Sequence, residues 1–424
     1  MNLKDKLANR IPVVRFESAA GDGSRASAVR PWHELTEIPG FTFYVLRLVT
    51  WILTFIGLIM VFSASTIMEL TRGQSPFTSF FRPLIIVIIG LVAMVVISRL
   101  PYRRIIRLAP TWAVFAVAFQ LSVFSPLGMG KGGNRNWVNL GITQFQPSEL
   151  LKLAFVLWLA WAIGIRHANM RRWQDVLGWV ALPTAVAIGV VMAGHDMGTA
   201  MIFVAIVAVV VFVAGMRGSV LVIAAGALML GAGLLVGISP SRRRRVVALF
   251  SSTPDPQGND LQTVHAQWGL GTGGLLGVGP GASRQKWNYL PEAHTDFIFA
   301  ILGEEFGFVG TTLVILLFIL LAYGLYRLMA TAKDPSVRIL AAGVAGWLLT
   351  QALINILVVV GWAPVIGVPL PFVSSGGSSL LSSLAAMGVI LSCAREEPGA
   401  DKLVRSRIRK RRPLAVTNRD RGRD

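Results

Sequence analysis

Residues 290–310, LPEAHTDFIFAILGEEFGFVG, join a polar, proton-active run to a long apolar segment. The polar run contains His294 and Asp296, and the apolar segment has Glu304 and Glu305 near its start. Carboxylates at the mouth of a membrane helix are costly to desolvate, so such residues are functional candidates. The stretch therefore indicates chemistry at a membrane surface, on a substrate that arrives through lipid.

The composition is that of a protein with many membrane spans. Of the 424 residues, 54% are hydrophobic and only 14% are charged, whereas soluble domains have about 25% charged residues. The net charge of +19 would suggest a nucleic-acid partner for a soluble chain. Here we expect no nucleic acid, because basic residues mark the cytoplasmic side of membrane proteins. The single cysteine, Cys393, excludes an intrachain disulfide and a cysteine-based zinc site.

Apolar runs predict an all-α polytopic membrane protein with about ten transmembrane helices. The first run is too long for a signal peptide and follows a polar stretch, so we expect an uncleaved first span. A long extracytoplasmic loop, residues 239–296, separates the seventh and eighth runs. The run at 297–326 is long enough to be strongly tilted or kinked, or to project beyond the bilayer. The ten runs are 44–67, 83–98, 108–126, 150–165, 176–193, 199–214, 219–238, 297–326, 339–361 and 380–393.

Lysine and arginine predict the orientation. They concentrate in the two ends of the chain and in the loops on the same side, which makes both tails cytoplasmic. We expect a flexible N-terminal tail at 1–42, a membrane domain at 43–395 and a basic C-terminal tail at 396–424. The arginine run at 242–245 opposes this rule. A topology error would explain it, and so would an outer loop whose RRRRVVALF stretch could lie as a short amphipathic helix on the outer leaflet. We favour the outer loop, because long loops are partly exempt from the rule.

The segment 134–152 carries the first cluster of candidate residues. Glu149 lies in the first turn of an expected helix, and Lys152 lies three residues on, so the two side chains can pair. A helix cap and a structural ion pair would explain them. Lys152, however, falls a turn inside an apolar run, which favours an anion site facing a cavity, with Arg135 as a second cation.

Two further motifs leave alternatives open. In 194–200, GHDMGTA, Asp196 is either the N-cap of the next helix or a carboxylate in a polar cavity. The run at 269–281, GLGTGGLLGVGPG, is not a nucleotide P-loop, because no Gly-Lys-Ser/Thr follows. Its amides could cradle a pyrophosphate, although tight turns against the bundle are the interpretation that we favour. Lys286 follows and adds positive charge beside the acidic motif.

Asp296 is the strongest catalytic candidate. A low-dielectric edge tends to raise the pKa of a carboxyl group toward that of a useful base, and His294 is two residues away. For Glu304 and Glu305 we expect that one pairs with a basic residue and that the other faces water. The last outer loop, 367–379, has irregular backbone that should line a cavity, with Ser378 as a contact. The five histidines show no metal-ligand spacing, so no structural metal is expected.

Four linked motifs resemble the SEDS family of cell-wall polymerases, whose branches include FtsW, RodA and SpoVE. They are NRNWVNLG with FQPSELLKLA, HDMGTA, YLPEAHTDFIFAILGEEFGFVG and GVPLPFVSSGGSS. The resemblance covers about residues 62–394, and FSAS at 62–65 with YLPEAHTD at 289–296 is most similar to the FtsW branch. The serine doublet at 374–375 and His195 depart from the pattern of many relatives.

The resemblance implies a SEDS-type fold and a peptidoglycan glycosyltransferase. Its substrate would be lipid II, a disaccharide-peptide on undecaprenyl pyrophosphate, at the outer face of the bacterial cytoplasmic membrane. It implies that Asp296 is the essential carboxylate and that Lys152 and Asp196 lie along one polar cavity. A class B penicillin-binding protein, which is a transpeptidase, and division proteins at the septum would be partners. No cofactor is expected, and assistance by a divalent cation stays open.

Our own analysis of the residues is compatible with this chemistry. A sugar hydroxyl needs a base and a leaving pyrophosphate needs cations, which Arg135, Lys152 and Lys286 would supply if their outer segments converge. The alternatives are a lipid II flippase or other transporter, an elongation polymerase like RodA, and a non-catalytic scaffold for division proteins. With Asp296 as the catalytic residue, the candidate substrate-binding residues are Arg135, Glu149, Lys152, Asp196, Lys286, His294 and Ser378.

Overall fold

A computed structural model describes residues 40–71, 76–131, 134–141, 144–216, 260–287 and 289–396, with isolated residues between 218 and 247. The chain divides into Met1–Ile38 and Pro39–Asp424, and the first unit lies outside the described residues. Four expected segments also lie wholly or largely outside the described residues. They are the tails at 1–42 and 396–424, the span at 219–238 and the arginine run at 242–245. The description below concerns the second unit.

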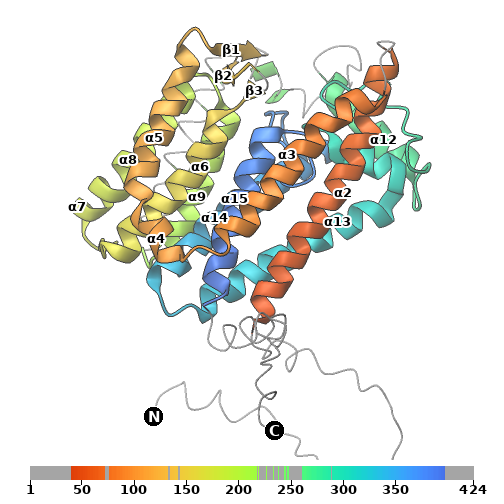
Figure 1. Ribbon diagram of the computed structural model, residues 1–424. Helices are drawn as coiled ribbons and strands as arrows, with labels where there is room; N and C mark the ends of the chain where they lie inside the picture. Colours follow the sequence, from red (N-terminus) through yellow and green to blue (C-terminus); the bar gives the residue numbers. More distant parts are fainter. Residues whose placement is uncertain are drawn as a thin grey trace, which may run out of the picture. The chain divides into compact units, whose positions relative to one another are not determined.

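Nine of the ten expected apolar runs coincide with helices (Figure 1). In the described part of the chain, seven helical segments are long and apolar enough to cross a membrane, and the segments 109–124 and 197–213 are shorter apolar helices. The protein is therefore an all-α polytopic membrane protein, as expected. The main helices are α2 (Phe41–Thr71), α3 (Pro76–Ile97), α5 (Ala109–Leu121), α6 (Pro147–Leu159), α8 (Leu182–Ala193), α9 (Met197–Val213), α13 (Ile298–Thr331), α14 (Pro335–Val360) and α15 (Gly377–Ala394).

Short helical segments complete these elements. Helix α6 continues into a π-helix, η2, and α7 leads through a second π-helix, η3, into α8. A further helix, α12, lies within the long loop and packs against α13. The bounds are α4 (Tyr102–Arg107), η1 (Ser122–Phe124), η2 (Ala160–Ile165), α7 (Trp173–Asp175), η3 (Val176–Ala181) and α12 (Leu261–Gly273).

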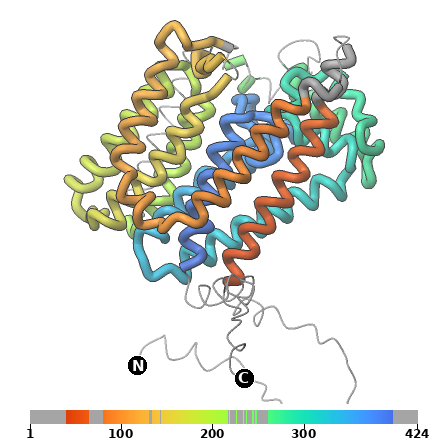
Figure 2. The backbone as a smooth tube through the Cα atoms, in the orientation of Figure 1, coloured from red at the N-terminus to blue at the C-terminus, as the bar shows by residue number. Residues whose placement is uncertain are grey.

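Helix α15 forms the centre of the bundle (Figure 2). Within this span, 83% of the residues are buried, and it packs against α2, α3 and α6. The sequence explains the burial, since small residues let membrane helices approach closely. A Cβ atom added to Gly388 would lie 2.9 Å from the Met94 carbonyl oxygen of α3. The C-terminal helix therefore organises the helices that carry the candidate residues.

Helix α13 is interrupted at Gly307, so the structure shows a kink, one of the possibilities left open for this long run. Gly307 has φ 65° and ψ −161°, a conformation essentially restricted to glycine. The glycine-rich segment fills the interruption: the amides of Val278 and Gly279 donate to the carbonyls of Glu304 and Glu305 at 2.9 and 3.1 Å. These amides are therefore bound to protein carbonyls, as expected for tight turns laid against the bundle and not for a pyrophosphate cradle.

A three-stranded antiparallel sheet lies between η1 and α6, where the sequence analysis expected only a loop. Its strands are β1 (Gly128–Lys131), β2 (Asn134–Asn139) and β3 (Gln144–Phe145), in the order β1-β2-β3. Asn136 and Val138 of β2 are buried and their neighbours are more exposed, which is the period of a strand. Figure 1 places the sheet at one end of the bundle, opposite α4 and α7. The sheet positions Asn136 beside the start of α9.

Candidate active site

Asp296 lies at the end of the segment that leads into α13, and it is half-buried. Gly367, from the last outer loop, faces its carboxylate: a Cβ atom added to Gly367 would lie 3.6 Å from Asp296 Oδ2. Gly367 has φ 70°, which favours glycine at this close approach. The neighbouring His294 carbonyl accepts from the Ser375 amide at 3.1 Å and from the Ser375 hydroxyl at 2.6 Å. Two loops that are far apart in the sequence therefore meet at Asp296.

Two amide side chains of α14 hold these loops together. Asn355 donates from Nδ2 to the carbonyl of Asp296 at 2.7 Å and to that of Val368 at 2.8 Å. Gln351, one turn earlier, donates from Nε2 to the carbonyl of Pro369 at 2.9 Å. Neither residue was among the candidates predicted from the sequence. The available signal was two carboxamides four residues apart in an apolar helix, which share one helix face and are costly to leave unpaired there.

Lys152 and Glu149 form the expected ion pair, with 2.9 Å between Nζ and Oε1. Both side chains are almost fully buried. Lys152 also donates to Gln351 Oε1 at 2.9 Å, and its ammonium lies 5.1 Å from the centre of the Trp347 ring. An anion cannot reach this ammonium without a rearrangement. Through Gln351, however, Lys152 is linked to the loop that faces Asp296.

Several buried polar atoms near this network have no hydrogen-bond partner in the described part of the chain. They are Glu149 Oε2, Ser148 Oγ, Asn355 Oδ1 and Ser383 Oγ. Those of Ser148, Glu149 and Asn355 belong to residues beside or within the network that supports Asp296. Such atoms also lie elsewhere in the described residues, for example Thr42 Oγ1 and Gln120 Oε1, so they do not by themselves mark a site.

Asp196 is the N-cap of α9, which settles the geometric part of the question left open above. Its Oδ1 accepts from the Thr199 amide at 3.0 Å. Its Oδ2 accepts from Asn136 and Gln146 at 3.0 Å each, and from the Thr199 hydroxyl at 2.9 Å. Asp196 therefore joins α9 to the sheet and to the start of α6. A direct contact of this carboxylate with a substrate would compete with these bonds.

The three cations expected to converge lie in separate clusters. Arg135 is exposed, and its Nη2 donates to the Ser125 carbonyl at 3.1 Å. Lys286 is buried and pairs with Glu305 Oε1 at 2.7 Å and with Ser63 Oγ at 2.8 Å. Neither residue shares a described partner with Lys152. The expectation of convergence is therefore not met, because a lysine buried in the bundle pairs with the nearest carboxylate.

Glu304 and Glu305 both turn inward. Glu305 has the basic partner that was expected, Lys286. The expectation that the other glutamate faces water is wrong: Glu304 is fully buried. It accepts from the Ser283 hydroxyl, from the Arg284 amide at 2.9 Å and from the Gln285 amide at 3.2 Å. The two glutamates thus fasten the segment before Asp296 to α13, immediately ahead of the Gly307 interruption.

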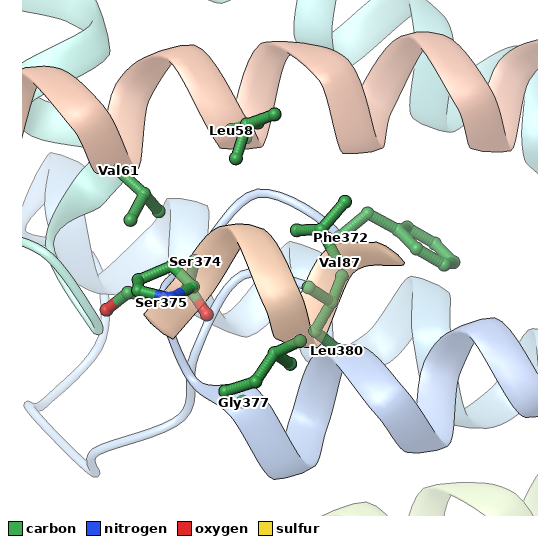
Figure 3. Close-up of a pocket in the computed structure, with 11 residues that line it drawn as sticks. Leu58, Val61, Val87, Phe372, Ser374, Ser375, Gly377 and Leu380 are labelled. Atoms are coloured by element: carbon green, nitrogen blue, oxygen red, sulfur yellow. The ribbon is translucent and has the colours of Figure 1, made fainter. Parts of the chain in front are cut away.

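The last outer loop also borders an apolar crevice between α2 and α3 (Figure 3). Leu58 and Val61 of α2 form one wall, and Val87 of α3 lies opposite. Ser374 and Ser375 line the same crevice, and Ser375 is the residue that donates to the His294 carbonyl. This small gap is therefore bordered by α2, by α3 and by the loop that contacts the segment of Asp296.

The remaining candidate, Ser378, is buried in the first turn of α15. Its neighbour Ser379 accepts from Gln351 Nε2 at 3.4 Å, so this turn borders the network. Over the described residues, no three His, Cys, Asp or Glu side chains gather as metal ligands would. The site is thus one half-buried carboxylate, held by carboxamides and loops above a buried ion pair and beside an apolar crevice.

This arrangement is that of a polytopic membrane protein with a candidate carboxylate site, and the comparisons with known proteins support its fold and family. Residues 44–398 match the family model described as "Cell cycle protein", which groups FtsW, RodA and SpoVE. The chain belongs to the FtsW/RodA/SpoVE family, which confirms the resemblance seen in its motifs.

Its relatives include two curated proteins. The chain is 34% identical over 375 residues to a probable peptidoglycan glycosyltransferase FtsW of Geobacter sp. (strain M18), covering 86% of this chain and 100% of that one. It is 37% identical over 361 residues to stage V sporulation protein E of Bacillus subtilis (strain 168), covering 83% and 96%.

Solved structures show the same fold. One is a chain of a peptidoglycan synthase complex described as coordinating polymerization and crosslinking, with a TM-score of 0.68, 29% identity and coverage of 83% of this chain and 97% of that chain. Another is the rod shape determining protein RodA of Thermus thermophilus, with a TM-score of 0.61, 28% identity and coverage of 83% and 96%.

Proposed function

We propose that this protein is a peptidoglycan glycosyltransferase that polymerises lipid II at the outer face of the bacterial cytoplasmic membrane. The names of its relatives support this reaction. The observation that carries the proposal is the position of Asp296, a half-buried carboxylate held between two loops at the end of membrane helices. A substrate that combines a sugar with a membrane-bound tail needs a catalytic group at this kind of boundary.

The reaction requires one proton acceptor. A hydroxyl oxygen of the acceptor sugar attacks the anomeric carbon of the donor sugar, and the bond from that carbon to the pyrophosphate oxygen breaks. The proton of the hydroxyl passes to the Asp296 carboxylate, and the polyprenyl pyrophosphate leaves with the electron pair. General-base catalysis of this kind contributes about 10²–10⁴ in rate.

The residues around Asp296 have positioning roles in this proposal. Asn355 fixes the backbone of Asp296, and Gln351 fixes the facing loop through the Pro369 carbonyl. Lys152 donates a hydrogen bond to Gln351 and is itself paired with Glu149. The position of the catalytic carboxylate must be accurate, because a misplacement of about 1 Å can lower the rate about 10²-fold. Lys152 therefore acts through its neighbours, with a direct bond to the pyrophosphate only if the network opens.

The substrate has two other parts to accommodate. The isoprenoid chain would stay in the lipid beside α2 and α3, two helices whose residues Leu58 and Val87 border the last outer loop. Arg135 is exposed on the sheet and offers a cation to a phosphate group that remains in water. Four residues stay candidate substrate contacts: Asp196, Lys286, His294 and Ser378. Asp196 and Lys286 also form the structural bonds described above.

The cellular setting is proposed on the same basis. Both tails lie in the cytoplasm, as the distribution of lysine and arginine predicts. The similarity to FtsW favours a role at the division septum with other division proteins. The similarity to a chain from a peptidoglycan synthase complex favours a class B penicillin-binding protein, a transpeptidase, as partner.

The test is polymerisation of purified lipid II by the purified full-length protein, with and without its cognate transpeptidase. We expect glycan strands in at least the reaction that contains both proteins. A parallel assay follows movement of lipid II between the leaflets of liposomes that contain only this protein. Transfer between leaflets with no glycan formed in either reaction would contradict the proposal and identify a flippase.

A further inference from the structure

A cluster of tryptophans with one arginine lies at the end of the bundle away from Asp296. Trp158 and Trp161 come from α6 and η2, and Trp179 comes from η3. The three ring centroids lie 5.2 to 6.1 Å apart. Arg166 follows η2 directly, and its guanidinium carbon lies 5.6 Å from the centre of the Trp161 ring and 5.2 Å from that of Trp179.

The two π-helices create this arrangement. The amide of Arg166 donates to the Trp161 carbonyl at 3.0 Å, an i to i+5 bond that brings the arginine back over that ring. Trp158 Nε1 donates to the Trp179 carbonyl at 3.0 Å and fixes η3 against α6. Cation–π contacts with both rings then hold the guanidinium. Such π-helical turns are rare and are frequent at functional sites.

The guanidinium has no anionic partner in the part of the chain that the structure describes. The guanidinium contacts the two rings, and the nearest acidic residue in sequence, Asp175, accepts from the Asn169 amide at 2.9 Å. Arg171 and Arg172 of the same short loop are exposed and raise the local positive charge. A guanidinium that lies near aromatic rings can still donate its N–H groups in a bidentate bond to a phosphate.

The surroundings are those of a membrane surface. In the span Trp173–Ala193, only 17% of the residues in the apolar window are buried, so most of it faces lipid. Leu177 and Trp173 near its start are 54% and 71% exposed. Tryptophans concentrate at the boundary between lipid and water. The cluster therefore lies at headgroup level, where the anionic groups at hand are lipid phosphates.

We propose that Arg166, held between Trp161 and Trp179, binds the phosphate of an anionic phospholipid headgroup. The site lies at the end of the bundle where Gly164 abuts Ser336, the first turn of α14. This is the cytoplasmic leaflet in the proposed topology. Arg166 differs from two other exposed arginines, Arg103 and Arg107. Arg103 contacts the single ring of Tyr102 and pairs with Asp334, and the structure gives Arg107 no ring contact.

Native mass spectrometry of the full-length protein in detergent tests this site. Phosphatidylglycerol, phosphatidylcholine and inorganic phosphate are titrated separately. We expect phosphatidylglycerol to bind more tightly than phosphatidylcholine, and R166Q to weaken its first binding step about five-fold. R166K should weaken it similarly, since lysine keeps the charge but loses the planar stacked group. The matched control R107Q should change it less than two-fold.

Three results would overturn the proposal. Equal losses in R166Q and R107Q would indicate only a general attraction of positive charge. Equal binding of phosphatidylcholine would exclude recognition of an anionic lipid. Displacement of the lipid by millimolar inorganic phosphate would identify a site for the free ion. A second readout is the tryptophan emission of W179L, which should lose the response to phosphatidylglycerol that the unmodified protein shows.

Discussion

The side-chain amide of Asn355 donates to the backbone carbonyl of Asp296 at 2.7 Å. The same nitrogen donates to the Val368 carbonyl at 2.8 Å, so one buried side chain joins the segment of the candidate base to the loop that faces it. This bond is made to the main chain of Asp296 and fixes its position. The position of the base is thus set from within the bundle, by α14.

Replacement of Asn355 by leucine should impair turnover more than substrate binding. The two carbonyls lose their donor, which costs about 1–3 kcal/mol when polar groups stay buried. We expect kcat to fall about ten-fold to a hundred-fold because the base shifts, with a KM that changes less than three-fold. Steady-state polymerisation kinetics measure both. L353A, an exposed site on the same helix, is the control, and an unchanged kcat in N355L would refute the positioning role.

Replacement of Lys152 by methionine should abolish polymerisation and leave membrane insertion intact. The substitution leaves the buried Glu149 carboxylate without its cation, which should lower the free energy of unfolding by about 3–5 kcal/mol. The double variant E149Q/K152M removes both charges and should regain most of the stability. If the account is right, this double variant stays inactive, because Gln351 has lost its support. A double variant with normal turnover would give Lys152 a purely structural role.

Gly307 should be intolerant of any side chain. Alanine there would need a φ of 65° and would place Cβ 2.4 Å from the Gly277 amide nitrogen. Strained backbone of this kind costs about 1–3 kcal/mol before the clash is added. We expect G307A to lower the thermal unfolding temperature in detergent. G271A is the matched control, since nothing lies within 4 Å of its added Cβ, and equal unfolding temperatures would contradict the structural role of the interruption.

Tyr102 and Asp334 give a prediction for alkaline pH. Burial raises the pKa of Tyr102 to about 12, and its hydrogen bond to Asp334 at 2.9 Å acts in the same direction. Since the folded-state pKa lies above the unfolded value of about 10, this contribution to stability is complete below that pH. It is lost as pH rises from 10 to 12. Y102F should therefore show a flatter decline of unfolding temperature over this window, whereas Y326F, at an exposed site, should decline as the unmodified protein does.

Much of the fold follows from the sequence because apolar length is a direct requirement of the bilayer. Nine expected runs became helices, and the long run near 297–326 is interrupted at Gly307 as its length suggested. The sheet at 128–145 was missed because its strands are short and it depends on the contact of Asn136 with Asp196. Such contacts between distant segments have no periodicity to detect.

The site was predicted in part. The choice of Asp296 as the candidate base stays a prediction. The sequence paired Glu149 with Lys152 because residues three apart share a helix face, and the structure shows this ion pair. It could not show that Lys286 would pair with Glu305, since their contact depends on how the long loop folds onto α13. Gln351 and Asn355 escaped notice because carboxamides carry no charge, although polar side chains inside a membrane helix are informative in their own right.

The most direct test of the central claim is the rate of lipid II polymerisation by D296N in complex with the transpeptidase. Asparagine keeps the size of the side chain and cannot accept the proton, so the account predicts a loss of at least about 100-fold. D175N, which removes a carboxylate remote from the site, should keep its full rate and shows that the preparation is sound. A folded, inserted D296N protein that polymerises lipid II at the normal rate would contradict the account.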